Sequence, residues 1–275
     1  VVYSGTDAII ISSFLGLRTG GLVANYVLLC DGVSKLLYKM LQGIIPSVAN
    51  LVYTDDREKS FHVYRMLDFV YFLIGGYVAC IYFIVLQPFV GLFFGSEFLL
   101  NDAYVIALAF NAFLGMQFEN AYNFRSTHGV FENDRGYMVL SAVTNLVLSV
   151  ILAQHLGVVG VMIGTIAGLS FIVYGRVQFV FRVIFRRSMK AYWWNHAWWS
   201  MVVLLEILLI DRILSDSFFS ATYMGLMIKC LCAAVLMLGM QILVFHRHEE
   251  FRSVCLYAGE AGRVLMNKVQ GRKSQ

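Results

Sequence analysis

The stretch NLVLSVILAQHLGVVGVMIGTIAG, residues 145–168, contains two apolar segments that meet at a short break. Its Leu, Val and Ile residues do not alternate with polar ones at a period of two, which argues against membrane β-strands. Apolar runs of about 20 residues are long enough to cross a bilayer as helices. Gly160, Gly164 and Gly168 recur every four residues, and such a stripe of small residues permits close helix packing. The stretch therefore predicts two membrane helices in close contact.

The composition of the whole chain is that of a membrane protein. Hydrophobic residues make up 59% of the 275 residues and charged residues 14%, whereas ordinary soluble domains are about 25% charged. A search for apolar runs of membrane-spanning length gives about eight helices. They are predicted at residues 1–17, 22–52, 64–94, 100–124, 136–156, 158–185, 193–213 and 221–246. The expected fold class is an all-α, polytopic membrane bundle.

Basic residues in the connections predict the orientation, because Lys and Arg are retained on the cytoplasmic side. Every second connection and the C-terminal tail are rich in Lys and Arg, whereas the opposite connections hold only Arg18 and Arg212. Both ends of the chain are thus expected in the cytoplasm. The stretch KAYWWNHAWW, residues 190–199, is typical of an aromatic belt at the headgroup level. Because the sequence opens VVY, without an initiator Met or a basic signal-peptide region, we expect a piece of a longer protein.

Sequence motifs of common enzymes do not occur in the chain. G-x-x-x-x-G-K-[ST], H-E-x-x-H and G-x-S-x-G are all missing. The five cysteines form no C-x-x-C pair, and the six histidines lie mostly at the ends of predicted helices. We therefore expect no enzymatic activity, no cofactor, no metal site and no nucleic-acid partner, and a function that resides among the helices.

Charged side chains mark the two opening helices. At 1.5 Å per residue, Asp7 lies about 15 Å from the outer end of its helix, and Asp31 and Lys35 lie about 14 and 20 Å along the next. The polar strip on that second helix consists of Asp31, Lys35, Lys39 and Gln42. Charges are costly in hydrocarbon, so the strip predicts a hydrated cavity in which the lysines bind an anionic headgroup. The alternative is a structural role, in which the two acids neutralise Lys35 and the second lysine extends toward the interface.

Other polar residues have structural interpretations. Glu206 and Lys229 lie at matched depths on either side of an outer turn and predict an ion pair that locks the last hairpin. Pro46 is expected to bend or end the second helix, because it removes a backbone hydrogen bond. A polar cluster at the inner end of the fourth helix is either a solvated cap or a cytoplasmic gate. It comprises Glu119, Asn120, Asn123 and Arg125.

Several segments, taken together, resemble a known family of membrane transporters. They are TDAIIISSFLGL (6–17), ANYVLL (24–29), IIPSVANLV (44–52), DDREKSFHVYRMLDF (55–69), FENDRGY (131–137) and the stretch at 145–168 quoted above. In order and spacing they resemble the oligosaccharide flippases that export O-antigen, capsule or teichoic-acid repeat units. That family belongs to the multidrug, oligosaccharidyl-lipid and polysaccharide exporter superfamily. The resemblance covers roughly residues 1–190.

The resemblance implies the second half of a two-lobed protein of about fourteen helices. Residues 1–186 would form the C-terminal six-helix transport lobe and 187–246 an added transmembrane hairpin. Apart from the resemblance, apolar and charged residues at helical spacing in 249–269 predict a basic amphipathic cytoplasmic tail at 247–275, with a solvated tail as the alternative. The implied function is alternating-access translocation of a polyprenyl-pyrophosphate-linked oligosaccharide to the outer leaflet of a bacterial plasma membrane. Expected partners are this lipid-linked oligosaccharide, membrane lipids, the missing N-terminal lobe and proteins of polysaccharide polymerisation and synthesis.

Two other classes of function stay open on the sequence. A drug or small-molecule antiporter would share the fold, because a fold does not determine its substrate. A non-transporting scaffold of a polysaccharide synthesis complex would depend on the amphipathic segment at 249–269 and would tolerate the loss of Lys35 and Lys39. The short outer connections disfavour a membrane-embedded glycosyltransferase.

Overall fold

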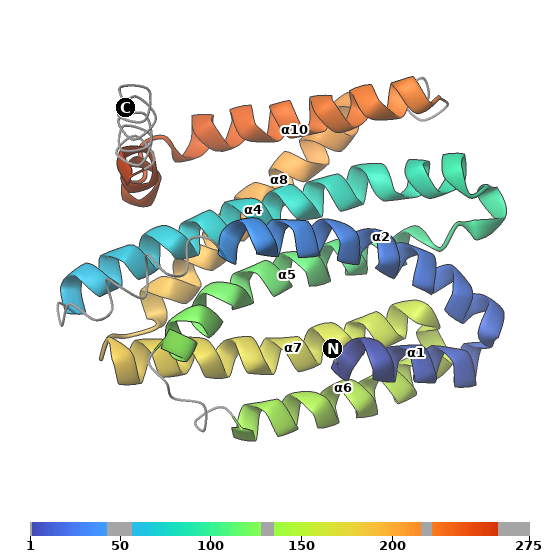
Figure 1. The fold of residues 1–275 in the computed structure, drawn as a ribbon, viewed down its shortest axis with the longest axis horizontal. Helices are drawn as coiled ribbons and strands as arrows, with labels where there is room; N and C mark the ends of the chain where they lie inside the picture. Colours follow the sequence, from blue (N-terminus) through green and yellow to red (C-terminus); the bar gives the residue numbers. More distant parts are fainter. Residues whose placement is uncertain (1, 43–56, 128–134, 216–221, 258–275) are drawn as a thin grey trace, which may run out of the picture.

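The computed structural model describes residues 2–42, 57–127, 135–215 and 222–257, and these residues form helices and turns only. The helices are α1 (Val2–Leu15), α2 (Leu17–Gln42), α4 (Arg57–Phe93), the 3-10 helix η1 (Ser96–Phe98), α5 (Asp102–Thr127), α6 (Arg135–Leu156), α7 (Val158–Phe179), the π-helix η2 (Val180–Ile184), α8 (Lys190–Ile213) and α10 (Tyr223–Phe245). A further helix covers 249–257. Figure 1 shows the long helices running back and forth along one axis, so the predicted all-α bundle is confirmed.

Within the described ranges, five helical segments are long and apolar enough to cross a membrane. They are Leu17–Leu37 of α2, Arg57–Phe93, Arg135–Leu156, Val158–Ile184 and Tyr223–Phe245, and a shorter apolar helix covers Gly5–Leu15. Large apolar side chains are exposed along α6, α8 and α10, as expected for helices that face lipid. The chain is therefore a multi-pass membrane protein, with five of the eight predicted spans supported by length and composition.

Helix α4 lies at the centre of the bundle, where α5, α8 and α10 pack against it (Figure 1). Its Phe69 and Phe72 rings lie 5.1 and 5.2 Å from the Trp199 ring of α8, and Phe69 lies 5.3 Å from the Phe245 ring of α10. Such aromatic pairs contribute about 0.5–1.5 kcal/mol each beyond the burial of their area. The last hairpin therefore docks on α4 through its aromatic side chains. Helix α4 also begins at Arg57, earlier than the predicted residue 64, because the charged turn that precedes the apolar run is helical.

Helices α6 and α7 pack closely along the glycine stripe of α7. A Cβ atom on Gly160 or Gly164 would collide with the backbone or a side chain of α6, and one on Gly168 would lie 2.8 Å from the Ser141 carbonyl oxygen. The Ser141 hydroxyl donates to the Gly168 carbonyl oxygen at 2.5 Å. The small residues therefore bring the two backbones into contact, as the stripe predicts.

The chain turns from α1 to α2 at a single residue, Gly16, whose φ is +89°. A left-handed backbone of this kind favours glycine. As a result α2 begins at Leu17 rather than at the predicted residue 22. The helix is described as far as Gln42, and the rest of its predicted range, 43–52, lies outside the described residues. Pro46, which was expected to bend or end this helix, lies outside the residues that the structure describes.

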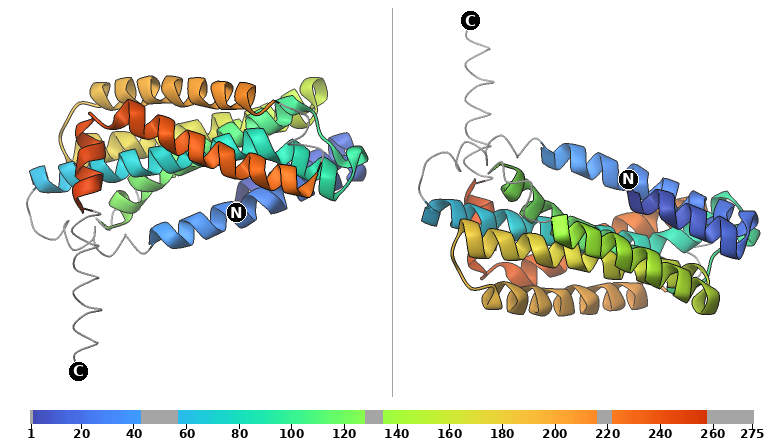
Figure 2. Two further views of the ribbon diagram at one scale, coloured as in Figure 1. Left: turned by 90° about the horizontal axis from the view of Figure 1, so that it is seen from above. Right: turned by 90° about the horizontal axis from the view of Figure 1, so that it is seen from below.

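Helix α2 packs on the bundle through one face. Val23, Tyr26 and Cys30 are buried, and the Tyr26 hydroxyl donates to Gln87 Oε1 of α4 at 2.6 Å. Only 17% of the apolar segment of α2 is buried, whereas 61% of that of α4 is buried. In Figure 2, α2 and α8 lie on opposite sides of the bundle, so the exposed face of α2 is remote from α8.

Candidate functional site

Asp7 belongs to a polar contact among α1, α6 and α7. The Thr165 hydroxyl of α7 donates to Asp7 Oδ2 at 2.8 Å, and the Asn145 amide of α6 lies 3.4 Å from Asp7 Oδ1. Asn145 also donates to Thr165 Oγ1 at 2.9 Å. Asp7 therefore joins α1 to the α6–α7 pair and is not in contact with a lysine among the described residues.

The predicted polar strip of α2 is exposed. Lys35 Nζ lies 3.1 Å from Asp31 Oδ2, and the side chains are 72% and 55% exposed. Lys39 is exposed as well, whereas the side chain of Gln42 lies outside the described part of the chain. The i, i+4 pair of the structural alternative is thus present, and the strip faces away from the bundle.

Asp7 and this strip do not share one depth, contrary to the expectation. Measured from the turn at Gly16, Asp7 lies about 13 Å along α1, whereas Asp31 and Lys35 lie about 22 and 28 Å along α2 at 1.5 Å per residue. The predicted overlap assumed that α2 begins at residue 22. The earlier start moves the strip toward the far end of the helix, so Asp7 is not part of it.

The predicted gate residues belong to α5, near its contacts with α4 and α7. The Asn123 amide donates to the Tyr71 hydroxyl of α4 at 3.0 Å, Arg125 is buried at 4% exposure and Glu119 is half-buried. Arg176 of α7 stacks on this region, with its guanidinium carbon 4.0 Å from the Phe118 ring centre. These residues are packed side chains rather than a solvated cap, since Arg125 and Asn123 lie within helix contacts.

Glu206 and Lys229 do not form the predicted ion pair. Both are buried, at 5% and 7% exposure, but within the described ranges neither oxygen of the Glu206 carboxylate has a hydrogen-bond partner. Equal depth along two helices does not place two side chains face to face, because each helix can be rotated about its axis. The sequence gives the depth of each residue but not the rotation of its helix, on which an ion pair also depends.

A cavity that the sequence did not predict lies between the start of α4, the η2 segment and the start of α8. It encloses about 360 Å³, within the range of small-molecule sites. Its polar lining includes Arg65 and Asp68 of α4, Arg187, His196 of α8, and Glu250 of the C-terminal helix. Segments that are far apart in the sequence, at 61–68, 181–199 and 250, thus build this site together.

Asp68 and His196 are two of the buried polar groups that line the cavity. Their side chains are 6% and 10% exposed, and His196 Nε2 lies 3.3 Å from Asp68 Oδ2, although the two atoms are not aligned as a hydrogen bond. His196 Nδ1 lies 3.1 Å from the Tyr192 carbonyl oxygen, one turn earlier in α8. The Asn120 amide donates to the Tyr64 carbonyl oxygen at 3.2 Å. Two ionisable groups of a membrane protein therefore face each other in a hollow, which favours a functional role for them.

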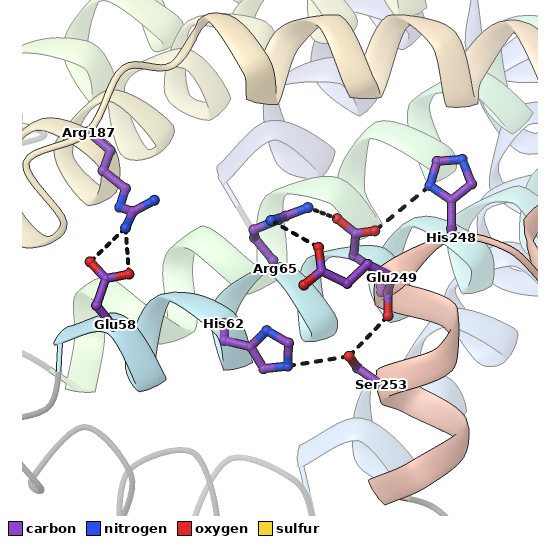
Figure 3. Close-up of polar contacts among 8 residues, drawn as sticks. Glu58, His62, Arg65, Arg187, His248, Glu249 and Ser253 are labelled. Atoms are coloured by element: carbon purple, nitrogen blue, oxygen red, sulfur yellow. Dashed lines mark hydrogen bonds and ion pairs between the residues drawn. The ribbon is translucent and has the colours of Figure 1, made fainter.

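Ion pairs at the rim tie the C-terminal helix to α4 (Figure 3). Arg65 pairs with Glu250 and lies 3.7 Å from Glu249, and Ser253 Oγ lies 3.3 Å from His62 Nε2. Glu250 is buried, with a side chain 5% exposed. The helix at 249–257 therefore covers one side of the cavity.

The other side of the rim is an irregular segment. The π-helix η2 supplies Phe181 to the cavity, and Arg186 just beyond it has φ +53°, a backbone region that few non-glycine residues adopt. This turn presents Arg187 to Glu58 of α4, with two contacts of 2.6 and 2.5 Å. π-Helical turns and left-handed residues are concentrated at functional sites, which favours this cavity as a site.

The described residues contain no group of three or more His, Cys, Asp or Glu side chains that could hold a metal ion. The fold and the cavity define a multi-pass helical membrane protein with a polar site at one end of its bundle. Comparison of the chain with family models, with curated proteins and with solved structures gives no match. The resemblance to flippases thus stays a prediction from the sequence.

Proposed function

We propose that this chain is one lobe of a flippase that moves a polyprenyl-pyrophosphate-linked oligosaccharide to the outer leaflet of a bacterial plasma membrane. In this proposal α5, α8 and the shorter α1 cross the membrane with the five apolar segments, and both ends of the chain face the cytoplasm. The missing N-terminal lobe lies against α2. The substrate's prenyl tail stays in lipid while the sugar and pyrophosphate cross a wet path between the lobes.

The observation that carries the proposal is the exposed charged face of α2. Asp31 and Lys35 are exposed within Leu17–Leu37, the segment of α2 that is long and apolar enough to cross a membrane, and Lys39 is exposed just beyond its end. Charges on such a helix face a water-filled hollow or another protein rather than hydrocarbon, because desolvation in lipid costs several kcal/mol. A second lobe that closes over this face would enclose a cationic path suited to a pyrophosphate.

The test is the leaflet accessibility of a labelled lipid-linked oligosaccharide in vesicles that contain the whole protein. A charge-assisted hydrogen bond contributes about 1.5–3 kcal/mol, so Lys35→Ala and Lys39→Ala should each slow translocation about tenfold or more when substrate is limiting. Lys190→Ala is the matched control, because Lys190 is also exposed but begins α8 on the opposite side of the bundle. Unchanged translocation in both α2 variants, or an equal loss in the control, would remove the basis of the proposal.

A further inference from the structure

The cavity beside Asp68 is lined by aromatic rings as well as by polar side chains. Its aromatic lining comprises Phe61, Tyr64, Phe181, Tyr192 and Trp199. A volume of about 360 Å³ is far larger than the roughly 30 Å³ share of one water molecule. The hollow therefore has room for a small organic molecule.

One oxygen of a carboxylate that lines this hollow is not satisfied by a hydrogen bond. Asp68 Oδ1 is buried and, in the part of the chain that the structure describes, has no hydrogen-bond partner. The nearest imidazole atom, Nε2 of His196, lies by the other carboxylate oxygen and is likewise without a hydrogen bond. A buried carboxylate is costly unless a donor or a cation satisfies it. The floor of the cavity thus lacks a positively charged group.

The two arginines of the cavity are engaged by other acids. Arg65 is engaged by Glu249 and Glu250, and Arg187 by both oxygens of Glu58. Their side chains are 38% and 42% exposed, whereas that of Asp68 is 6% exposed. The guanidinium groups therefore form a neutralised rim above an acidic, aromatic floor.

We propose that this cavity binds an organic ammonium group, with Asp68 as its counter-ion and the aromatic rings around it. Aromatic faces attract ammonium ions through their quadrupoles, most strongly where water is excluded. The ammonium group is that of a free amine from the cytoplasm or of a lipid headgroup such as choline or ethanolamine. Because α2 and α8 lie on opposite sides of the bundle (Figure 2), this site is separate from the proposed path along α2.

The test is binding of radiolabelled choline to the full chain in nanodiscs of phosphatidylglycerol, measured by scintillation proximity. Excess unlabelled choline should displace the label, whereas its neutral isostere 3,3-dimethylbutanol should not. Equal displacement by the isostere would overturn the proposal, since the site would then recognise shape rather than charge. A second set of discs with added phosphatidylcholine separates the sources. Weaker choline binding there assigns the site to a lipid headgroup, and unchanged binding assigns it to a free amine.

Two variants and one control complete the test. Asp68→Asn should weaken choline binding at least tenfold, and Glu206→Gln should leave it unchanged, because Glu206 is a buried acid that does not line the cavity. Phe181→Leu keeps all charges and removes one aromatic wall, so it should weaken binding several-fold even if Asp68→Asn does not fold. Phe61 is unsuitable for this variant, because the Arg187 guanidinium already lies 4.2 Å from the centre of its ring. Wild-type affinity in a folded Asp68→Asn variant, or in Phe181→Leu when the first variant does not fold, contradicts the proposal.

Discussion

Asp7 and Asp31 are both carboxylates on apolar helices, yet the structure gives them opposite surroundings. Asp7 accepts a hydrogen bond from Thr165 within a three-helix contact, while Asp31 pairs with Lys35 on an exposed face. The sequence placed both at a similar depth and could not distinguish them, because depth along a helix does not specify the direction in which a side chain points. Neighbouring helices decide that direction.

The Asp7 contact should stabilise the association of α1 with α6 and α7. Thr165→Val removes the hydroxyl that donates to Asp7 at 2.8 Å and keeps the shape of the side chain. Hydrogen bonds between membrane helices contribute about 0.6 kcal/mol on average and up to about 1.7, so we expect a loss near the upper value, because a carboxylate is left with one donor fewer. The measurement is the free energy of unfolding in mixed micelles titrated with sodium dodecyl sulfate.

Ser170→Ala is the matched control for Thr165→Val. The Ser170 hydroxyl is exposed and donates to the Ile166 carbonyl oxygen of its own turn at 2.8 Å. Its loss should change the free energy of unfolding by less than about 0.5 kcal/mol. Equal losses in the two variants would show that Asp7 does not contribute to helix association.

The candidate cavity shows which part of a site such a sequence conceals. Asp68 and His196 are far apart in the chain, and His196 stands within the Trp-rich stretch 190–199 that was interpreted as an aromatic belt. The one available signal was that each is an ionisable residue within or next to an apolar run, a feature that marks functional positions in membrane helices. Their pairing depends on how α8 docks on α4, which no local pattern encodes.

At the scale of elements, apolar length and glycine spacing were the most informative patterns. The helix predicted at 136–156 is Arg135–Leu156, and that predicted at 158–185 is α7 followed by η2, ending at Ile184. Among the described helices, the predicted start differs most from the observed one at α4. This helix begins at Arg57 rather than at residue 64, because a charged turn precedes the apolar run. Hydropathy thus locates the middle of a membrane helix better than its ends, because polar turns continue the helix beyond the lipid core.

The α6–α7 contact should depend on Gly164. Its Cβ position is occupied by Ser149 of α6, and overpacking of this kind costs about 1–3 kcal/mol, so Gly164→Ala should lower the free energy of unfolding by that amount. Gly239→Ala is the control, because no atom lies within 4 Å of the Cβ position in α10. There alanine should be neutral or stabilise the helix by about 0.5–1 kcal/mol. Both variants are compared in the same sodium dodecyl sulfate titration. A similar small effect at both positions would mean that α6 and α7 are not in close contact at Gly164.

At the scale of the whole molecule, basic residues collect at one end of the bundle. The start of α4, the end of α5 and the junction between η2 and α8 lie together at the left in Figure 1. This end carries Arg57, Lys59, Arg65, Arg125, Arg182, Arg186, Arg187 and Lys190. Among the described residues the opposite turns carry only Arg18 and Arg212. Because Lys and Arg are retained in the cytoplasm during insertion, the basic end should face the cytoplasm.

Two single-cysteine proteins test this orientation. Cys255 is exposed on the C-terminal helix at the basic end, and Ser96 is exposed in η1 at the other end. One protein keeps Cys255 and has alanine at the other four cysteines; the second has alanine at all five and Ser96→Cys. A membrane-impermeant maleimide should label the second protein in intact cells and the first only after permeabilisation. Size-exclusion chromatography checks that each protein is folded, since Cys30 and Cys80 are buried.

The reverse labelling pattern would invert the topology and place the Asp68 cavity on the outer side, where no cytoplasmic amine could reach it. The alternating direction of α5 to α10 requires an odd number of membrane crossings between α4 and the C-terminal helix. Labelling of both cysteines from the same side would contradict this number.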